Sequence, residues 1–406
     1  MKKSLTLTTW TVAVVWLLVS HMAIAQTDED DVSYQDGYYF IPSVSVSRIW
    51  DDNVFFTFDS LGEIPGDDPD EPGVEIEKVS DEVTRIAPGM ELGYGSDRLD
   101  WRAFLSVESE DYQEQNQLDS SSARRIAQMA VEYLPTRLMT LSLSALYSQS
   151  NTPGELNLLT TIEPGRFEAE QTSISPAVSY RFSSSSLARM QLTLSSSQLI
   201  TGVDGETTDF MAEWEESLGR QDTVIYGYSY RNYAFDTGAD QYSHTPTIGW
   251  EHQFSAATSA LLTAGPRITE DSAEPYLGLS LMHNYETGVV SIAYELGETY
   301  LIGEAGRLEA ESLRMDLTQD VGENLVFTLS PSYAKVQREV TETEAYQVAL
   351  NATYRFNDAL SVFATYDHNY QEEDLDILGN REFTRNVFFV GFTLRYPRPY
   401  ARTTEQ

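Results

Sequence analysis

Cysteine is absent from the 406 residues, and histidine occurs only five times. Without thiols the chain has neither a disulfide framework nor a cysteine metal cluster. Basic residues are also scarce, with 26 Lys and Arg against 63 Asp and Glu, for a net charge of −37. Nucleic-acid binding needs a basic surface, so this balance argues against a nucleic-acid partner. After residue 25 there is no continuous apolar run of about 18 residues, so the sequence offers no spanning helix.

Residues 1–25 have the composition of a secretory signal. Two lysines precede an apolar stretch at 5–24, which closes with Ala-Ile-Ala at 23–25. A basic start, an apolar middle and a close of small residues are typical of a cleaved export signal, so we expect cleavage after Ala25. A retained anchor helix is the alternative. A short acidic segment, 26–38, follows, and loss of the two lysines leaves 24 basic against 63 acidic residues, or −39.

Hydrophobic and polar residues alternate along many segments of the chain. In residues 346–356, apolar side chains at every even position alternate with mainly polar ones at the odd positions. Successive side chains of a β-strand point to opposite faces, so such a segment has one apolar face and one wet face. Helical spacing would mix the two sets. Similar alternation occurs at 99–107, 141–148, 224–231, 312–318 and 388–396.

A soluble β-sandwich also alternates, and three features separate it from a membrane barrel. Segments of about ten residues repeat from Tyr39 to Tyr396, the length that a tilted strand needs to cross a bilayer. Tyr, Trp and Phe gather near the segment ends, where interfacial girdles lie. Eight tight turns alternate with nine longer connections, which implies eighteen strands with both termini on the tight-turn side. The sequence therefore predicts an all-β fold, a transmembrane antiparallel up-and-down β-barrel at 39–396, with a periplasmic tail at 397–406.

The last expected strand carries a candidate barrel-assembly signal. Gly391, Leu394 and Tyr396 resemble the signal of outer-membrane proteins, in which hydrophobic residues follow a glycine by three and five positions. Phe389 stands where a polar residue is usual, and ten residues follow Tyr396 where the signal usually ends the chain. An ordinary edge strand is the alternative. We expect outer-membrane lipid and the barrel-assembly machinery as partners, and the Gram-negative outer membrane as the location.

The wet faces of the expected strands define a set of candidate lumen residues. Mixed charges across a lumen set a transverse field and narrow the path, whereas internal ion pairs that stiffen the barrel are the alternative role. By parity the candidates are Arg85, Glu91, Arg102, Glu132, Arg181, Glu213, Arg231, Glu251, Arg314, Asp316, Arg355, Asp367 and Arg395.

Catalytic and metal-binding motifs are missing. The chain has no H-E-x-x-H, no G-x-S-x-G and no phosphate loop. His244 with Asp240 and Ser243 could form a hydrolase site at one rim, but Ser and Asp are abundant by chance. The acidic run Asp67–Glu71 lacks the spacing of a calcium loop and fits a solvated loop better. We therefore expect no enzyme activity, no cofactor and no metal.

Proline recurs inside the expected strands. Pro88, Pro176 and Pro246 are each followed by apolar residues at every second position. Because proline lacks the N–H that a strand donates to its neighbour, each should mark a bulge or a locally bent pairing.

Two elements resemble a known family. An alternating strand ends in Asp51-Asp52-Asn53-Val-Phe, and after a long connection Pro88-Gly89-Met-Glu-Leu begins another. This pattern resembles the β-barrel porins found with exopolysaccharide export genes, although the strong acidity of this chain departs from the family. The resemblance implies an eighteen-stranded outer-membrane component of polysaccharide secretion.

Three functions remain open. The resemblance favours a conduit or accessory in exopolysaccharide export, with polysaccharide and periplasmic export components as partners. A general diffusion porin, cation-preferring because of the acidic balance, is the first alternative. A plugged structural or adhesion barrel that acts through its outer loops is the second. Porins usually carry a long constriction loop, and no connection obviously exceeds that at 57–80. On this ground we favour export.

Overall fold

The structure is a computed structural model that describes residues 37–59, 78–152, 154, 156–157, 160, 162, 165–200, 202–338, 341–374 and 380–396. The predicted signal at 1–25, the acidic run at 67–71 and the tail at 397–406 lie outside these ranges, as does all of the segment 26–38 except its last two residues. Within the described ranges, no helix is long and apolar enough to cross a membrane.

Eighteen strands and one short 3₁₀ helix make up the described elements. They are β1 (Gly37–Asp51), β2 (Asp81–Gly95), β3 (Leu99–Tyr112), η1 (Asn116–Leu118), β4 (Ser120–Thr136), β5 (Met139–Ser150), β6 (Ala169–Arg181), β7 (Ser186–Leu199), β8 (Gly205–Ser217), β9 (Asp222–Phe235), β10 (Gln241–Ser255), β11 (Thr258–Ile268), β12 (Ala273–Tyr285), β13 (Gly288–Thr299), β14 (Leu308–Val321), β15 (Leu325–Gln337), β16 (Glu342–Asn357), β17 (Leu360–Asp374) and β18 (Asn380–Arg395).

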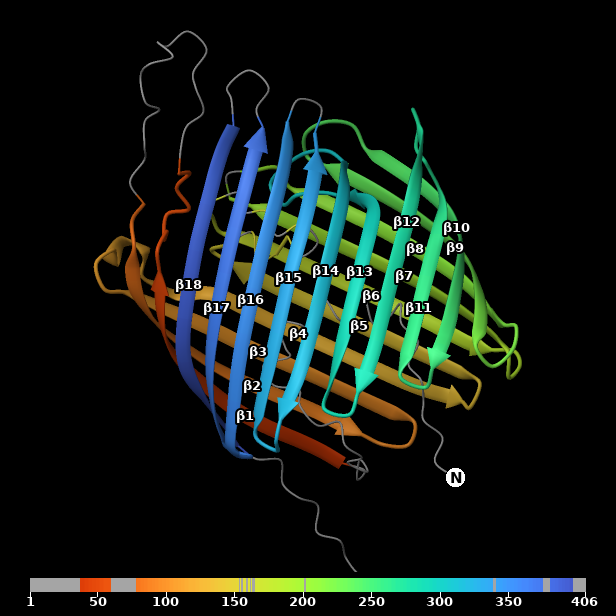
Figure 1. The fold of residues 1–406 in the computed structure, drawn as a ribbon, viewed down its shortest axis with the longest axis horizontal. Coiled ribbons are helices and arrows are strands. Elements are labelled where there is room, and N and C mark those ends of the chain that lie inside the picture. Colours follow the sequence, from red (N-terminus) through yellow and green to blue (C-terminus); the bar gives the residue numbers. More distant parts are fainter. Residues whose placement is uncertain are drawn as a thin grey trace, which may run out of the picture. The chain divides into compact units, whose positions relative to one another are not determined.

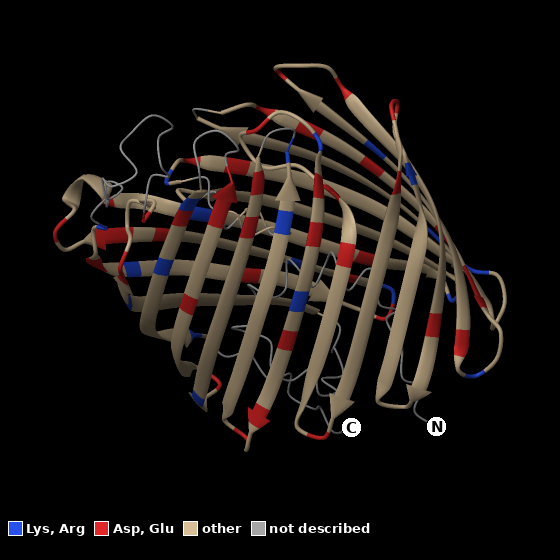
Figure 2. Cartoon of the chain, turned by 45° about the horizontal axis from the view of Figure 1, so that its top comes forward, with Lys and Arg blue, Asp and Glu red and all other residues tan. Residues whose placement is uncertain are grey.

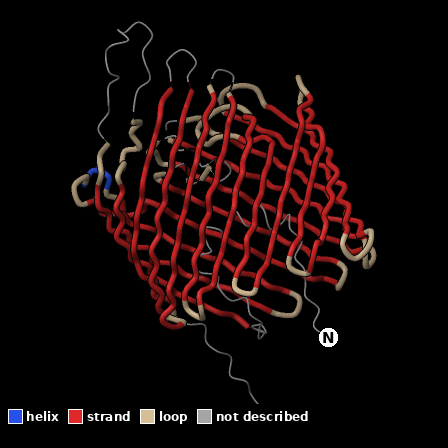
Figure 3. Tube along the Cα trace, viewed as in Figure 1, coloured by secondary structure: helices blue, strands red, loops and turns tan. Residues whose placement is uncertain are grey.

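The strands form one closed antiparallel sheet (Figures 1 and 3). Each strand pairs with its neighbours in sequence, and β18 pairs with β1 from Ser43–Arg395 to Asp51–Val387. Closure leaves no strand edge with unpaired N–H and C=O groups, which lipid would not tolerate. The prediction of an eighteen-stranded transmembrane β-barrel is confirmed. Its predicted bounds, 39–396, differ slightly from the observed Gly37 and Arg395.

Short and long connections segregate to opposite ends of the barrel. The eight predicted tight turns join β2 to β3 and each later even-numbered strand to its successor as far as β16 to β17. The other nine connections join each odd-numbered strand to the next; most are longer, although those after β11 and β15 are no longer than the turn after β6. The first residue of β1 pairs with the last residue of β2, so the described chain begins at the tight-turn end. Figure 2 shows many of the charged residues toward the other end.

Side chains alternate between an exposed apolar outer face and a polar inner face. Leu105, Leu350 and Val390 are 41%, 43% and 37% exposed although they lie in the middle of strands. Their neighbours in sequence point the other way, because the side-chain period of a strand is two. In water such a surface would be unstable, whereas in a bilayer it faces lipid.

The prolines interrupt pairing without shifting it. Pro88, Pro176 and Pro246 each lie in register opposite one neighbouring strand. On the other side the pairing skips the proline and resumes in the same register. The recorded register shifts lie elsewhere, in β3, β4, β10 and β16. Of the two outcomes predicted at these prolines, the bulge is therefore wrong, because a missing donor costs only the bonds of one edge; a locally bent pairing stays a prediction.

Candidate functional site in the lumen

All the predicted lumen residues lie on the inner face, opposite the parity of the exposed apolar side chains. Several of them are paired there. Arg85 contacts Glu110 at 2.7 Å, and Arg395 contacts Glu91 at 2.5 Å. Asp316 accepts a hydrogen bond from the Ser330 hydroxyl at 2.7 Å. The predicted charges thus include members of internal ion pairs, the alternative role considered for them.

The connection between β5 and β6 crosses the lumen. Its residue Ile162 is buried in a cluster with Leu301, Val336 and Ala345. Val336 and Ala345 belong to β15 and β16, and β15 lies nine strands on from β6 in a ring of eighteen. A segment anchored at β5 and β6 can reach that wall only by crossing the interior. Export was favoured because no connection obviously exceeds that at 57–80; the crossing at 151–168 removes that ground, since a shorter connection also reaches across the lumen.

The connection between β13 and β14 meets the crossing segment. The Oδ1 atom of Asn157 accepts the backbone N–H of Ile302 at 3.1 Å, and its side-chain amide donates to the Ile162 carbonyl at 3.2 Å. Leu156 and Ile302 share a second buried cluster with Ala169, against which Leu199 and Tyr300 pack. Burial raises the pKa of the Tyr300 phenol, which keeps it neutral.

A third connection joins this assembly. The backbone N–H of Val203, between β7 and β8, donates a hydrogen bond to the Gly303 carbonyl at 3.0 Å. Gly303 has φ +88°, and a Cβ atom there would lie 2.2 Å from the Leu199 side chain. A side chain at this position would therefore be both strained and blocked. Three connections, two from neighbouring strand pairs and one from the far side of the sheet, together constrict the lumen at the end that carries the longer connections.

One wall beside this constriction holds an arginine–carboxylate network. Arg267, on β11, is 3% exposed as a side chain, and its Nη2 atom lies 2.9 Å from Glu309 on β14. Its Nε atom lies 3.1 Å from Glu274 on β12 and 3.7 Å from Glu298 on β13. Arg307, in the β13–β14 connection, lies 3.3 Å from Glu298. The network therefore ties that connection to four strands of the wall, β11 to β14.

Arg231 extends the network along β9. It contacts Asp209 at 2.7 Å and donates a hydrogen bond to the Glu298 carbonyl at 3.1 Å. Of this network, only Arg231 was predicted as a lumen residue. The odd parity of Arg267 within 258–268 was a usable signal, but the carboxylates that contact it come from three other strands, β12, β13 and β14. Their convergence is a tertiary feature.

A smaller network anchors the crossing segment on the opposite side. Arg166, just before β6, contacts Glu110 on β3 at 3.2 Å. Its guanidinium lies 5.0 Å from the centre of the Tyr112 ring. Glu110 also contacts Arg85, so one carboxylate joins the wall to the connection. Sequence parity identified Arg85, whereas Arg166 lies outside any alternating segment.

The family-like motif closes the barrel seam. Asn53 is fully buried, its amide donates to the Thr57 and Thr384 carbonyls at 2.8 and 3.2 Å, and its Oδ1 accepts the Thr57 N–H. Asp51 contacts Arg385 of β18 at 2.7 Å. Asp52 accepts the backbone N–H of Asn386 at 2.7 Å. Every member therefore binds the last strand or the start of the first connection, while Pro88 and Gly89 lie within the β1–β2 pairing.

The candidate assembly signal also lies at this seam. A Cβ atom on Gly391 would lie 2.5 Å from the Val46 carbonyl oxygen and 2.6 Å from the Phe363 ring. The glycine therefore lets β18 approach β1 while the neighbouring ring covers it. Leu394 and Tyr396 are exposed on the outer face.

Ser243 and His244 do not converge. Ser243 is buried on the inner face and donates a hydrogen bond to Glu298. His244 lies on the outer face, where its Nδ1 atom forms a hydrogen bond with the Tyr228 hydroxyl at 2.7 Å. Among the described residues no group of three or more His, Cys, Asp or Glu could hold a metal ion.

Fold and lumen define the chain as a transmembrane β-barrel with an internal constriction. It matches no known family and no curated protein. Among solved structures it is similar to OccAB4 of Acinetobacter baumannii, with 10% identity, coverage of 90% and 100% of the two chains and a TM-score of 0.44. It is also similar to OpdQ of Pseudomonas aeruginosa, with 10% identity, coverage of 88% and 98% of the two chains and a TM-score of 0.45. For the siderophore receptor PirA of the same organism the identity is 9%, the coverage is 89% of this chain and 81% of that chain, and the TM-score is 0.44.

Proposed function

We propose that this chain is an outer-membrane channel that passes small polar solutes and prefers cations. One observation carries the proposal: the β5–β6 connection crosses the lumen and is packed against the opposite wall through Ile162. Such a crossing leaves passages narrower than the barrel, so it favours small solutes over a thick polymer. Polar inner faces provide a wet path through the apolar belt.

The cation preference rests on the charges at the constriction. Three arginines of the large network, Arg231, Arg267 and Arg307, face the carboxylates of Asp209, Glu274, Glu298 and Glu309. The network is therefore net negative, as is the chain as a whole at −37. A lumen with excess carboxylates raises the local concentration of cations.

The outer-membrane location rests on the closed sheet, its exposed apolar belt and the expected signal at 1–25. Lipid contacts that belt, and the assembly machinery would read Gly391, Leu394 and Tyr396. A transport role without catalysis agrees with the separation of Ser243 from His244.

Planar-bilayer recording tests the channel. The purified barrel should give discrete conductance steps, and a KCl gradient should give a reversal potential of the sign for cation flow. A barrel that inserts without conducting would contradict the channel, and an anion-selective reversal potential would contradict the charge argument.

Exopolysaccharide export is the second candidate, and the Asp51-Asp52-Asn53 and Pro88-Gly89 elements favour it. Since Asp51, Asp52 and Asn53 each contact β18, and Asn53 also bonds the start of the first connection, the motif has a structural role that either function would need. Deletion of the gene distinguishes the two: loss of extracellular polysaccharide supports export, whereas normal polysaccharide with reduced uptake of small cations supports the channel.

A further inference from the structure

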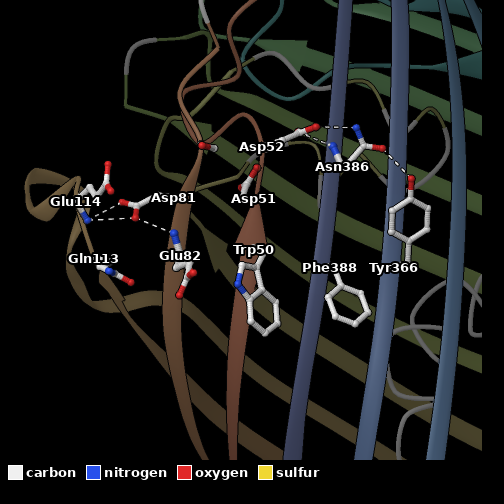
Figure 4. A pocket seen from close by; sticks show the side chains of 11 residues that line it. Trp50, Asp51, Asp52, Asp81, Glu82, Gln113, Glu114, Tyr366, Asn386 and Phe388 are labelled. Atoms are coloured by element: carbon white, nitrogen blue, oxygen red, sulfur yellow. Dashed lines mark hydrogen bonds between the residues drawn. The ribbon is translucent and has the colours of Figure 1, made fainter.

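Many carboxylates of the described strands are held by a cation or by a hydrogen-bond donor. At the seam, Asp52 accepts a hydrogen bond from the Asn386 side-chain amide at 2.7 Å, shown in Figure 4. In the wall network, four carboxylates share Arg231, Arg267 and Arg307. A carboxylate whose charge is shared in this way attracts a passing cation less strongly than an unpaired carboxylate does.

Glu295 on β13 has no such partner. It lies on the inner face, between the outward-facing Tyr294 and Leu296, and it is exposed. Among the described residues it forms no ion pair, and its side chain accepts no hydrogen bond. Its cross-strand neighbours are Gly278 on β12 and Ser312 on β14, and neither is long enough to cover the carboxylate. Glu295 therefore presents its charge directly to the water of the lumen.

The position of Glu295 is close to the constriction. Three residues farther along β13 is Glu298 of the wall network, at a distance of about 10 Å along the strand. The connection that narrows the lumen begins two residues after Glu298. Charges act over about 8–10 Å in physiological salt, so Glu295 acts on ions that approach the constriction from the tight-turn side.

The surroundings of Glu295 leave room for an ion. A Cβ atom on Gly297, the next inner-face residue of β13, would lie 3.1 Å from the Glu295 Oε1 atom and 3.6 Å from the Tyr276 ring. The glycine therefore leaves open the space beside the carboxylate that a side chain would fill. Positive charges of Arg231 and Arg314 act on Glu295, but neither residue is bonded to it, so they weaken its field without neutralising it.

Three other glutamates of the inner face also lack an ion pair among the described residues, and each lies four residues from the tight-turn end of its strand: Glu132, Glu213 and Glu251. The three connections that narrow the lumen lie at the opposite end. Counted along the strands, Glu295 is nearest to that end, four residues from the last residue of β13. A charge in a wider part of a pore affects passing ions less, because water and salt screen it.

We infer that Glu295 determines the preference of the channel for cations. The inference rests on the proposed channel and assigns its selectivity to a residue outside the wall network. Small hydrated cations are concentrated beside this unpaired carboxylate before they enter the constriction, and anions are repelled there.

Cysteine substitution tests this residue without interference, because the chain has no cysteine of its own. In planar-bilayer recordings, Glu295→Cys should lower the ratio of K⁺ to Cl⁻ permeability about five-fold, the effect of one unit charge at contact distance in water. Reaction with anionic 2-sulfonatoethyl methanethiosulfonate should restore the ratio, and the cationic 2-(trimethylammonium)ethyl reagent should lower it further. Glu295→Gln, which keeps the size of the side chain, should reproduce the first loss.

The matched control is Glu132→Cys. Glu132 is also an exposed inner-face glutamate without an ion pair among the described residues, but it lies near the tight-turn end of β4. There the substitution and each reagent should change the permeability ratio less than about two-fold, because salt screens the charge before the constriction.

Equal effects at the two positions would overturn the inference, as would failure of the thiol in Glu295→Cys to react in the folded barrel. A channel that prefers cations and keeps its permeability ratio in both Glu295 variants would overturn the inference and leave the proposed function intact. A barrel that does not conduct would overturn both.

Discussion

Asn157 and Ile302 are 145 positions apart in the sequence, yet the side chain of the first accepts the backbone N–H of the second at 3.1 Å. The bond joins two connections that start from opposite parts of the sheet. Both residues are buried, so the bond is shielded from competing water. It is the most direct sign that the longer connections form a single constriction.

Asn157→Ala should loosen this constriction. The variant removes the acceptor of the Ile302 N–H and the donor to the Ile162 carbonyl, and an unsatisfied buried group costs about 1–3 kcal/mol. We expect a larger or noisier single-channel conductance with unchanged barrel folding. Asn351→Ala is the control, because the Asn351 amide bonds Thr365 within the wall, at 2.7 Å. Equal conductance changes in both variants would refute the role of the Asn157 bond.

Arg267→Met should release the wall network. Glu274, Glu298 and Glu309 would lose their shared guanidinium. Removing one partner of a buried ion pair lowers the free energy of unfolding by about 3–5 kcal/mol. Repulsion among these carboxylates should displace the β13–β14 connection and increase cation selectivity. The reversal potential in a KCl gradient measures this.

Arg395→Met provides the comparison for Arg267→Met. Arg395 contacts Glu91 on the inner face near the tight-turn end of the barrel, away from the constriction. A selectivity change as large in Arg395→Met, or none in Arg267→Met, would show that the network does not control the path.

Gly391→Ala should impair closure of the barrel. Its new methyl group would lie 2.5 Å from a backbone oxygen of β1, and overpacking of this kind costs about 1–3 kcal/mol. We expect a lower yield of the heat-modifiable folded form. Gly219→Ala is the matched control, since nothing lies within 4 Å of the Cβ position there. Equal folding yields would contradict the packing argument.

Asn53→Ala tests the motif at the seam. The fully buried side chain bonds both the first connection and β18, so its loss should lower the free energy of unfolding by about 2–4 kcal/mol. Urea titration in detergent measures this. Asn380→Ala, whose exposed amide bonds Glu372 at 3.0 Å, should have little effect. A similar loss in both variants would leave the motif without a special structural role.

Local patterns predicted the wall of this protein well. Alternation at 346–356 identified β16, and the tight turns counted along the chain predicted the eighteen strands. Parity also placed Arg231 and Arg314 on the inner face. At Pro88, Pro176 and Pro246 a bulge or a locally bent pairing was expected, and no bulge is found, because the missing donor interrupts the pairing on one edge of the strand without a change of register.

The sequence by itself determined which side chains meet lipid and which meet the lumen, because a strand alternates its faces at every residue and lipid requires a closed sheet. Only the tertiary structure decided how the lumen is narrowed. The anchors of the crossing segment, Ile162 with Val336 and Arg166 with Glu110, join positions with no periodic relation in the chain. Contacts across a barrel depend on how far each connection reaches inward, and no local pattern encodes that distance.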